Sequence, residues 1–241
     1  MLEQCSTEDT VFPPTILYNE GWMLRLVLDW FSTLRESDYY FSFPENGKWY
    51  SEALLPSPFL PRYRGDKYAE SWTHSDGVIG HFEIGRDRNV DLTFSPNGRA
   101  LKILEAKMFS KLSLGTTHAK YYNQAARNVA CIAEILKRAN SNPSDISSLA
   151  FYVVAPEVQI EEGAFSEFIT LDSIKATVEC RVNEYDESKE EWYQGWFLPT
   201  LERIDLRTIS WEEIVSHIQQ VDSSFGQALD EFYYLCLKYN R

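Results

Sequence analysis

The chain is poor in the residues that build thiolate metal sites, disulfides and histidine-based catalytic sites. Its 241 residues include four widely spaced cysteines, none in a Cys-x-x-Cys pair. This spacing argues against structural zinc and predicts reduced thiols in a cytoplasmic protein. The four histidines have no spacing typical of a ligand set or of a Ser-His-Asp triad, so we expect surface or core roles for them.

Long hydrophobic runs and glycine-rich loops are also missing. No apolar stretch reaches the length of a membrane span, and the first residues lack the basic start and apolar core of a signal peptide. We therefore expect no membrane association. The sequence has no glycine-rich phosphate loop, which argues against a nucleotide-driven motor.

Positive charge is scarce, with 23 lysines and arginines against 36 acidic residues and a net charge of −13. This balance weighs against nucleic acid as a partner, because phosphate binding depends largely on lysine and arginine contacts. The charge is uneven, however. Residues 102–138 hold seven basic and two acidic residues, whereas residues 157–191 hold three basic and eleven acidic ones. The acidity is therefore concentrated outside the basic middle of the chain.

What the sequence has in quantity is apolar and aromatic side chains, at 44% and 15%. This content predicts a folded globule rather than a disordered chain. The length suits one large domain spanning 1–241. We expect a core at about 19–156, an acidic elaboration at about 157–200, and a C-terminal strand and helices at 201–241.

The stretch from Asn89 to Lys107 carries the most informative pattern. Two strand-like runs flank the turn residues 96–98, which predicts a β-hairpin. Alternation sends Glu105 and Lys107 to one face at the end of the second strand. If Asp91 on the paired strand reaches the same spot, two carboxylates face one lysine. Such a set suits a hard divalent cation.

Periodicity predicts the surrounding elements. Asn19 is expected to cap an amphipathic helix, and Ser210 to open a late one. Residues 37–72 contain four prolines and are expected to hold no long strand. The remaining expected elements are strands at about 77–84, 149–155 and 203–209, and helices at about 118–139 and 163–182.

In this context, Asp91 followed by Glu105-x-Lys107 resembles the signature of the PD-(D/E)xK, or restriction-endonuclease-like, nuclease superfamily. The order of helix, three strands, helix and strand over about 19–156 is similar to the core of that family, although Val90 replaces the signature proline. The resemblance implies an α/β fold with a restriction-endonuclease-like mixed central β-sheet flanked by helices. It also implies a metal-dependent nuclease that hydrolyses phosphodiester bonds, with DNA favoured.

The resemblance assigns roles to particular residues. Asp91 and Glu105, with the backbone carbonyl of Ala106, would hold Mg²⁺ or Mn²⁺. Lys107 would orient the attacking water, and Gln124 on the next helix would help to position it. For Gln124, and for Arg127 on the same helix, an ordinary polar helix face is an equally weighted alternative.

Further residues are secondary candidates. Glu20 is a second-rank metal ligand by resemblance, and its simpler role is to favour the dipole of its helix. Lys111, Lys120 and Arg127 are expected to contact substrate phosphates, with the acidic segment turned away from them. Residues 62–67 could line a nucleic-acid groove or form a solvated loop.

Two rival functions remain open at this stage. One is a catalytically inactive nuclease-like fold that binds nucleic acid or a protein. The other is a structural subunit whose acidic surface docks a basic protein. The joint presence of Asp91, Glu105 and Lys107 favours catalysis, because unpaired charges beside a sheet core are costly. A homodimer or a partner subunit could supply contacts that one basic patch lacks.

Overall fold

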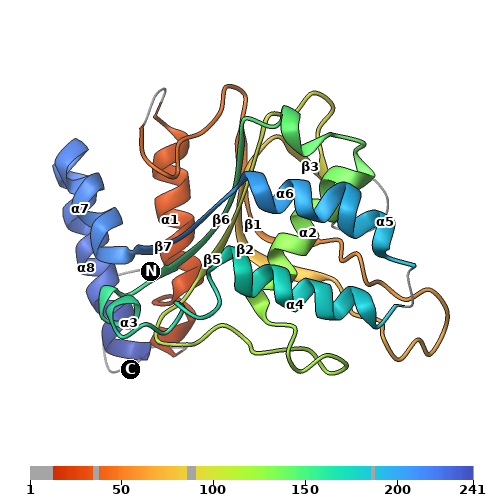
Figure 1. Ribbon diagram of the computed structural model, residues 1–241. Helices are drawn as coiled ribbons and strands as arrows, with labels where there is room; N and C mark the ends of the chain where they lie inside the picture. The colour runs from red at the N-terminus through yellow and green to blue at the C-terminus, as the bar shows by residue number, and fades with distance from the viewer. Residues whose placement is uncertain (1–12, 35–37, 86–90, 186–187, 241) are drawn as a thin grey trace.

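A computed structural model describes residues 13–34, 38–85, 91–185 and 188–240, and a five-stranded mixed sheet lies at its centre (Figure 1). The strand order is β1 (Lys48–Leu55), β2 (Thr73–Gly80), β5 (Ala100–Ala106), β6 (Ser148–Ala155) and β7 (Ile204–Ser210). The pairs β1–β2 and β2–β5 are antiparallel, whereas β5–β6 and β6–β7 are parallel. The predicted α/β class with a mixed sheet is therefore confirmed.

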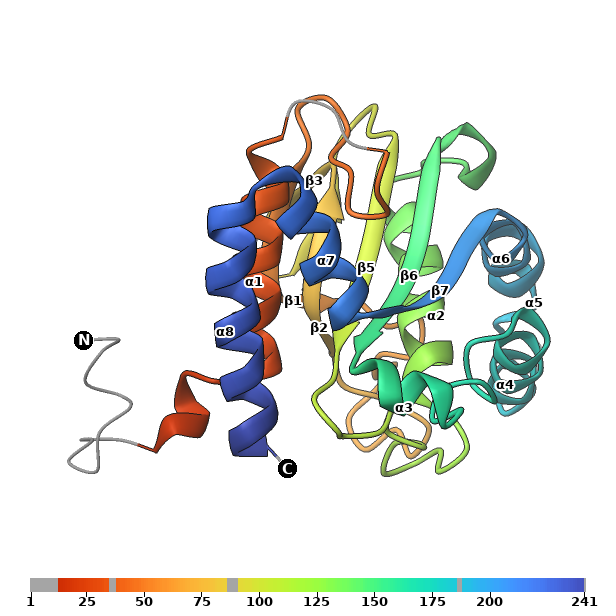
Figure 2. The same ribbon diagram turned by 90° about the vertical axis from the view of Figure 1, so that its left-hand side faces the viewer.

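Helices cover both faces of this sheet (Figures 1 and 2). One face carries α1 (Glu20–Ser32), α7 (Trp211–Val221) and α8 (Ser223–Asn240). The other carries α2 (Gln124–Arg138), α4 (Leu171–Asn183), α5 (Glu190–Trp192) and α6 (Leu198–Arg203). The short α3 (Glu157–Glu161) follows β6. Each described helix is too short or too polar to cross a lipid bilayer.

Strand alternation sorts the side chains of β5 between two hydrophobic cores. Leu101 and Ile103 pack into the core beneath α2, whereas Leu104 and Ala106 pack into the core beneath α1. A period of two is what a strand with both faces covered requires. Glu105 shares the face of Leu101 and Ile103, so its carboxylate is directed to the α2 side.

Side-chain caps fix where the helices start. Asn19 accepts a hydrogen bond from the Trp22 backbone N–H at 3.0 Å, and Ser210 accepts one from Glu213 at 3.0 Å. Both predicted caps are confirmed. The predicted helix at 118–139 begins later, at Gln124, because the Asn123 side chain caps it by accepting from the backbone of Ala126 at 3.0 Å.

The predicted hairpin within 89–107 is wrong. β4 (Leu92–Phe94) pairs with β3 (Phe82–Ile84) in a separate two-stranded sheet, while β5 pairs with β2. The reason lies at Gly80, where φ is +145° and an added Cβ would lie 2.2 Å from the Ala100 carbonyl oxygen. Only glycine fits this close approach, and the chain leaves the main sheet after it. The expected strand at 77–84 is therefore two strands.

Two other expectations also need correction. Residues 37–72 do contain a long strand, β1, because their prolines fall on either side of it. The helix expected at 163–182 begins only at Leu171, where Thr170 caps it by accepting from the Ser173 backbone at 3.1 Å. β1 is an outer strand with alternating exposure at its start, which the aromatic and proline content of its surroundings concealed.

A buried lysine in β5 gives a prediction about stability. Lys102 is 5% exposed, and its Nζ donates to the carbonyl oxygens of Tyr40 at 2.9 Å and Ser42 at 2.8 Å. Burial lowers the pKa of Lys102 to about 8, and the charge of Asp205 partly opposes this shift. An unfolded lysine has a pKa near 10.4. Between these two values the unfolded chain binds more protons, so the free energy of unfolding should rise with pH.

We expect the Lys102→Met variant to lose this rise. Urea unfolding at pH 7.5 and 9.5 measures it, and the gain on raising the pH should be larger in the wild type by about 1–2 kcal/mol. Equal gains in the two proteins would show that Lys102 keeps its proton as readily when folded as when unfolded.

Candidate functional site

Acidic side chains from two neighbouring strands meet at one end of the central sheet. Gly77 of β2 stands opposite Leu104 of β5, so the antiparallel register places Asp76 opposite Glu105. The Asp76 carboxylate accepts a hydrogen bond from the backbone N–H of Ala106 at 2.7 Å. Asp76 and Glu105 therefore lie side by side, tied together through the backbone of β5.

Glu105 is the buried centre of the site, with 2% of its surface exposed. Its Oε1 accepts from the Lys107 ammonium at 2.6 Å and from the Gln124 side-chain amide. Its Oε2 is buried and has no hydrogen-bond partner among the described residues. A buried carboxylate oxygen without a donor is costly, so this atom is suited to a ligand that supplies positive charge.

The backbone of Lys107 is fixed from two directions. Its N–H donates to the Val154 carbonyl of β6 at 2.8 Å, and its carbonyl accepts from the indole N–H of Trp211 at 3.0 Å. Trp211 is fully buried at the start of α7. The lysine therefore leaves the sheet from a rigid point, which holds its ammonium group beside Glu105.

Gln124 joins the site from the first position of α2. While its amide nitrogen donates to Glu105, its Oε1 accepts from the backbone N–H of Ser113 at 3.1 Å. These bonds fix the orientation of the amide and link the loop after Lys107 to the carboxylate. The structure thus brings Glu105, Lys107 and Gln124 together, as the resemblance implies.

The electrostatics of the site favour a bound cation. Burial raises the pKa of Glu105 to about 8; the neighbouring Asp76 carboxylate adds to the rise, and Lys107 opposes it. A buried and a half-buried carboxylate that stand side by side gain from a shared positive charge. The carbonyl of Ala106 points to the same side of β5 as its N–H, which is the side of Asp76.

These groups fit a magnesium or manganese ion. Mg²⁺ is commonly bound through one or two carboxylates, with water and substrate phosphate completing its shell. Asp76, Glu105 and the Ala106 carbonyl match that set. No group of three or more acidic, histidine or cysteine side chains that could hold a metal occurs in the parts of the chain that the structure describes. The donors named above are carboxylate and carbonyl oxygens, which suit a hard cation rather than zinc.

Asp91 lies elsewhere, and its predicted pairing with Glu105 is wrong. Asp91 forms an isolated bridge with Leu54 of β1, and its carbonyl accepts from the Gly85 N–H at 3.2 Å. Three steps between chain segments separate it from β5, roughly 14 Å at about 4.8 Å a step. Asp76 occupies the position expected of Asp91.

The sequence did contain a signal for Asp76. This residue stands directly before the apolar Gly77-Val-Ile of β2, and the predicted strand starts at residue 77, four residues after the actual start of β2 at Thr73. An acidic residue at the start of an apolar strand that pairs antiparallel with a strand ending in Glu-x-Lys can lie beside that glutamate. Asp76 is therefore the alternative to Asp91 as the second carboxylate.

Two other acidic residues need a structural account: Glu20, which the sequence predicts as a second-rank metal ligand, and Glu52, for which it predicts no role. Glu20 starts α1 on the opposite face of the sheet, where its charge acts on Cys236 of α8, so the structure supports its dipole role rather than metal binding. Glu52 lies opposite Asp76 in the register of β1 and β2, with φ at +58°. Its carboxylate is turned to Arg25 at 3.4 Å and is half-exposed.

The residues expected to contact the substrate lie on or beside the loop that follows Lys107. Lys111 and Lys120 are exposed on it, and Arg127 donates to the Ser113 hydroxyl from α2. The acidic segment is not fully turned away from this loop. Gln159 of α3 donates to the Ser110 carbonyl at 3.0 Å, because α3 follows the end of β6 beside the site. This contact is made by an uncharged side chain, and the placement of the acidic residues away from the substrate stays a prediction.

Comparison with protein families, with curated proteins and with solved structures finds no match for this chain.

Proposed function

We propose that this protein is a metal-dependent nuclease that hydrolyses phosphodiester bonds, most readily in DNA, on a restriction-endonuclease-like core. The observation that carries the proposal is the placement of Asp76, Glu105 and Lys107 at one end of β2 and β5, with Glu105 Oε2 buried and unpartnered among the described residues. The order of an acidic residue, then Glu-x-Lys, resembles the family signature, with Asp76 in the place first given to Asp91.

Each residue has a role that follows from its contacts. Asp76, Glu105 and the Ala106 carbonyl would hold Mg²⁺ or Mn²⁺. A bound ion of this kind polarises a phosphoryl oxygen and lowers the pKa of water. The Lys107 ammonium lies beside Glu105, where it would orient water and offset developing negative charge. Gln124 keeps the Glu105 carboxylate in one orientation through its bonds to Glu105 and Ser113.

The cost of this arrangement favours catalysis over a binding role. Glu105 is 2% and Lys107 8% exposed, and a second carboxylate stands beside them. Buried ionic groups are often no more stabilising than apolar residues of similar volume. A fold that only binds a partner would gain stability by losing them, so their retention supports a chemical use.

The uneven charge of the chain is compatible with a DNA substrate. Lys111 and Lys120 are exposed near the site, and screening at physiological salt limits the reach of distant carboxylates to about 8 Å. A few lysine contacts give weak binding and a shallow salt dependence. A second copy of the chain or a partner subunit would then supply further contacts.

A cleavage assay tests the proposal. Labelled single- and double-stranded DNA and RNA are incubated with the protein in Mg²⁺, in Mn²⁺ or in EDTA. We expect metal-dependent cleavage of DNA, and a loss of about 10²–10⁴-fold in rate for Lys107→Ala. Lys175→Ala, at an exposed position of α4, is the matched control and should cleave normally. If the wild type cleaves none of the substrates, the binding-module alternative is favoured.

A further inference from the structure

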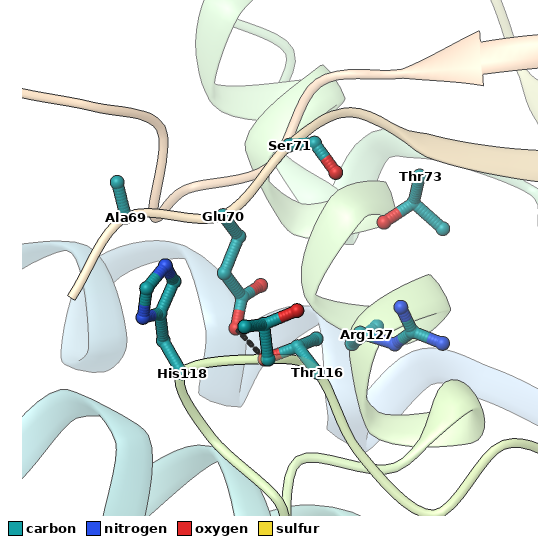
Figure 3. Close-up of a pocket in the computed structure, with 8 residues that line it drawn as sticks. Ala69, Glu70, Ser71, Thr73, Thr116, His118 and Arg127 are labelled. Atoms are coloured by element: carbon teal, nitrogen blue, oxygen red, sulfur yellow. Dashed lines mark hydrogen bonds between the residues drawn. The ribbon is translucent and has the colours of Figure 1, made fainter. Parts of the chain in front are cut away.

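A polar cavity adjoins the proposed catalytic residues, and the roles above leave it unused. Its volume is about 240 Å³, and it lies between residues 69–73, the loop at 116–118 and Arg127 of α2 (Figure 3). Glu70 enters it from the segment leading into β2, and Arg127 enters from the helix. A carboxylate and a guanidinium thus line one cavity together with hydroxyl groups.

Glu70 supplies the acceptor of this cavity. The residue is 7% exposed, and its Oε1 accepts from Arg181 Nε at 3.2 Å and from the Thr116 hydroxyl at 3.4 Å. The hydrogen bonds of its carboxylate to the described residues all use Oε1, and Glu70 lines the cavity. One carboxylate oxygen is therefore held in place while the other is free to accept from a ligand.

Arg127 supplies the donors. Its Nη2 donates to the Ser113 hydroxyl at 2.5 Å, which anchors the side chain. Within the described residues neither Nε nor Nη1 has an acceptor, although Nε is buried. A guanidinium that is anchored through Nη2 and has no acceptor for Nη1 is prepared to donate from Nη1 to a ligand with oxygen or nitrogen acceptors.

Hydrogen bonds through Ser113 link the cavity to the proposed catalytic residues. Ser113 accepts from Arg127 through its hydroxyl and donates to Gln124 through its backbone N–H. Thr73, which lines the cavity, precedes Asp76 in β2 by three residues, or roughly 10 Å. A ligand in the cavity would thus lie about one nucleotide away from a phosphate held at Asp76 and Glu105.

The chemistry of the lining selects a base rather than a phosphate. A phosphate would face the Glu70 carboxylate and be repelled, whereas a nucleobase can satisfy a carboxylate and a guanidinium together. Guanine offers two N–H donors on its pairing edge and two acceptors, O6 and N7, which are the preferred partners of arginine. Thymine and uracil have no amino group, and adenine and cytosine offer only one donor group.

We propose that this cavity binds an unpaired guanine base of the substrate strand, next to the phosphodiester that is cleaved. The inference rests on the proposed nuclease function for the identity of the strand, but the cavity itself can be tested without catalysis. Enzymes that read an unstacked base commonly do so by hydrogen bonds to its pairing edge in a pocket. The cavity would therefore give the enzyme a preference for single-stranded or locally opened DNA that contains guanine.

Binding of mononucleotides tests the inference. The four deoxynucleoside 5′-monophosphates and inorganic phosphate are titrated into the protein in EDTA, with affinity measured by NMR. The buffer is at pH 8, because burial raises the pKa of Glu70 to about 7 while Arg181 and Arg127 lower it. We expect dGMP to bind at least about tenfold more tightly than dAMP, dCMP or TMP. Inorganic phosphate should bind most weakly.

Two variants locate the bound base. Glu70→Gln and Arg127→Gln should each weaken dGMP binding about tenfold or more, since each removes a charged hydrogen-bond partner. Arg207→Gln, at an exposed position of β7, is the matched control and should leave it unchanged. Glu70 is buried, and its replacement can prevent folding. If the Glu70→Gln protein does not fold, the Arg127→Gln variant alone tests whether the base binds in this cavity.

Several outcomes would overturn the inference. Equal affinities for the four nucleotides, equal binding of inorganic phosphate, or unchanged dGMP affinity in Arg127→Gln each rule out a guanine pocket. Selective dGMP binding without cleavage of any substrate would support the guanine pocket and contradict the proposed nuclease function. DNA cleavage without selective dGMP binding would support the nuclease function and contradict the guanine pocket.

Discussion

Replacing Asp76 by asparagine should nearly abolish DNA cleavage, whereas the same change at Asp91 should leave it intact. Asp76 lies opposite Glu105 and is tied to Ala106, while Asp91 is bridged to β1. Asparagine keeps the shape of the side chain but removes the negative charge that a cation requires. We expect a loss on the order of 10²–10³-fold for Asp76→Asn, the scale of removing one preorganised electrostatic group.

Single-turnover cleavage of end-labelled DNA in Mg²⁺ measures both variants under the same conditions. Thermal unfolding of each protein serves as the control for folding, because the Asp76 side chain also accepts a backbone hydrogen bond. The assignment fails if Asp91→Asn is the inactive variant, or if a well-folded Asp76→Asn protein cleaves at the wild-type rate.

The Arg181→Met variant should be strongly destabilised. Arg181 lies on α4 with no exposed surface, and its Nε donates to Glu70 at 3.2 Å. Its other nitrogens donate to the Glu184 carboxylate and to the Tyr68 carbonyl. Its guanidinium also lies over the Phe59 ring, at 5.1 Å from the centroid. This one side chain joins α4 to the segment that leads into β2.

Methionine would fill much of the space but leave the Glu70 carboxylate buried without its main cation. Removing one partner of a buried ion pair costs about 3–5 kcal/mol. For a chain of this length, each kcal/mol lowers the melting temperature by about 2–4 °C, so the expected fall is roughly 6–20 °C. Urea and thermal unfolding measure it. Arg207→Met is the matched control, since its ion pair with Asp205 is exposed and should contribute at most about 1 kcal/mol.

A second substitution distinguishes lost pairing from lost packing. If the unpaired carboxylate causes the destabilisation, Glu70→Leu combined with Arg181→Met should recover part of the loss. Strictly additive effects of the two changes would place the cost in packing instead. An Arg181→Met protein as stable as the Arg207→Met control would contradict the role of Arg181 altogether.

Local patterns were enough to predict the second half of the site. Alternation along β5 put Glu105 and Lys107 on one face, and the apolar run of β6 marked a central strand. Periodicity predicted the helix that carries Gln124, whereas the role of Gln124 came from the family resemblance. These features depend on residues close together in the sequence, for which the periods of strands and helices are informative.

Local patterns were not enough to predict the acidic residue that precedes Glu-x-Lys in the signature. Which residue lies beside Glu105 depends on which strands pair. The turn residues 96–98 favoured pairing of β4 with β5, yet the close approach of Gly80 to Ala100 directs β2 to β5 instead. A glycine in an apolar run is typical of a bulge or of a close backbone approach, but it does not indicate which strand approaches. The choice moved the expected ligand from Asp76 to Asp91.

The contacts of Arg181 were hidden for a related reason. Arg181 and Glu70 are 111 residues apart, and each belongs to a segment that reads as a charged surface. Their burial follows from the packing of α4 against α2, which no local period encodes. The cavity beside Glu70 could therefore be found only from the fold.

Mn²⁺ binding by the purified protein tests the metal site most directly, and calorimetry at pH 8 without nucleic acid measures it. We expect the wild type to bind Mn²⁺, and Asp76→Asn and Glu105→Gln to lose that binding. Asp91→Asn should retain it. A wild type that binds no Mn²⁺, or binding that survives both Asp76→Asn and Glu105→Gln, would contradict a metal-dependent site at the end of β2 and β5.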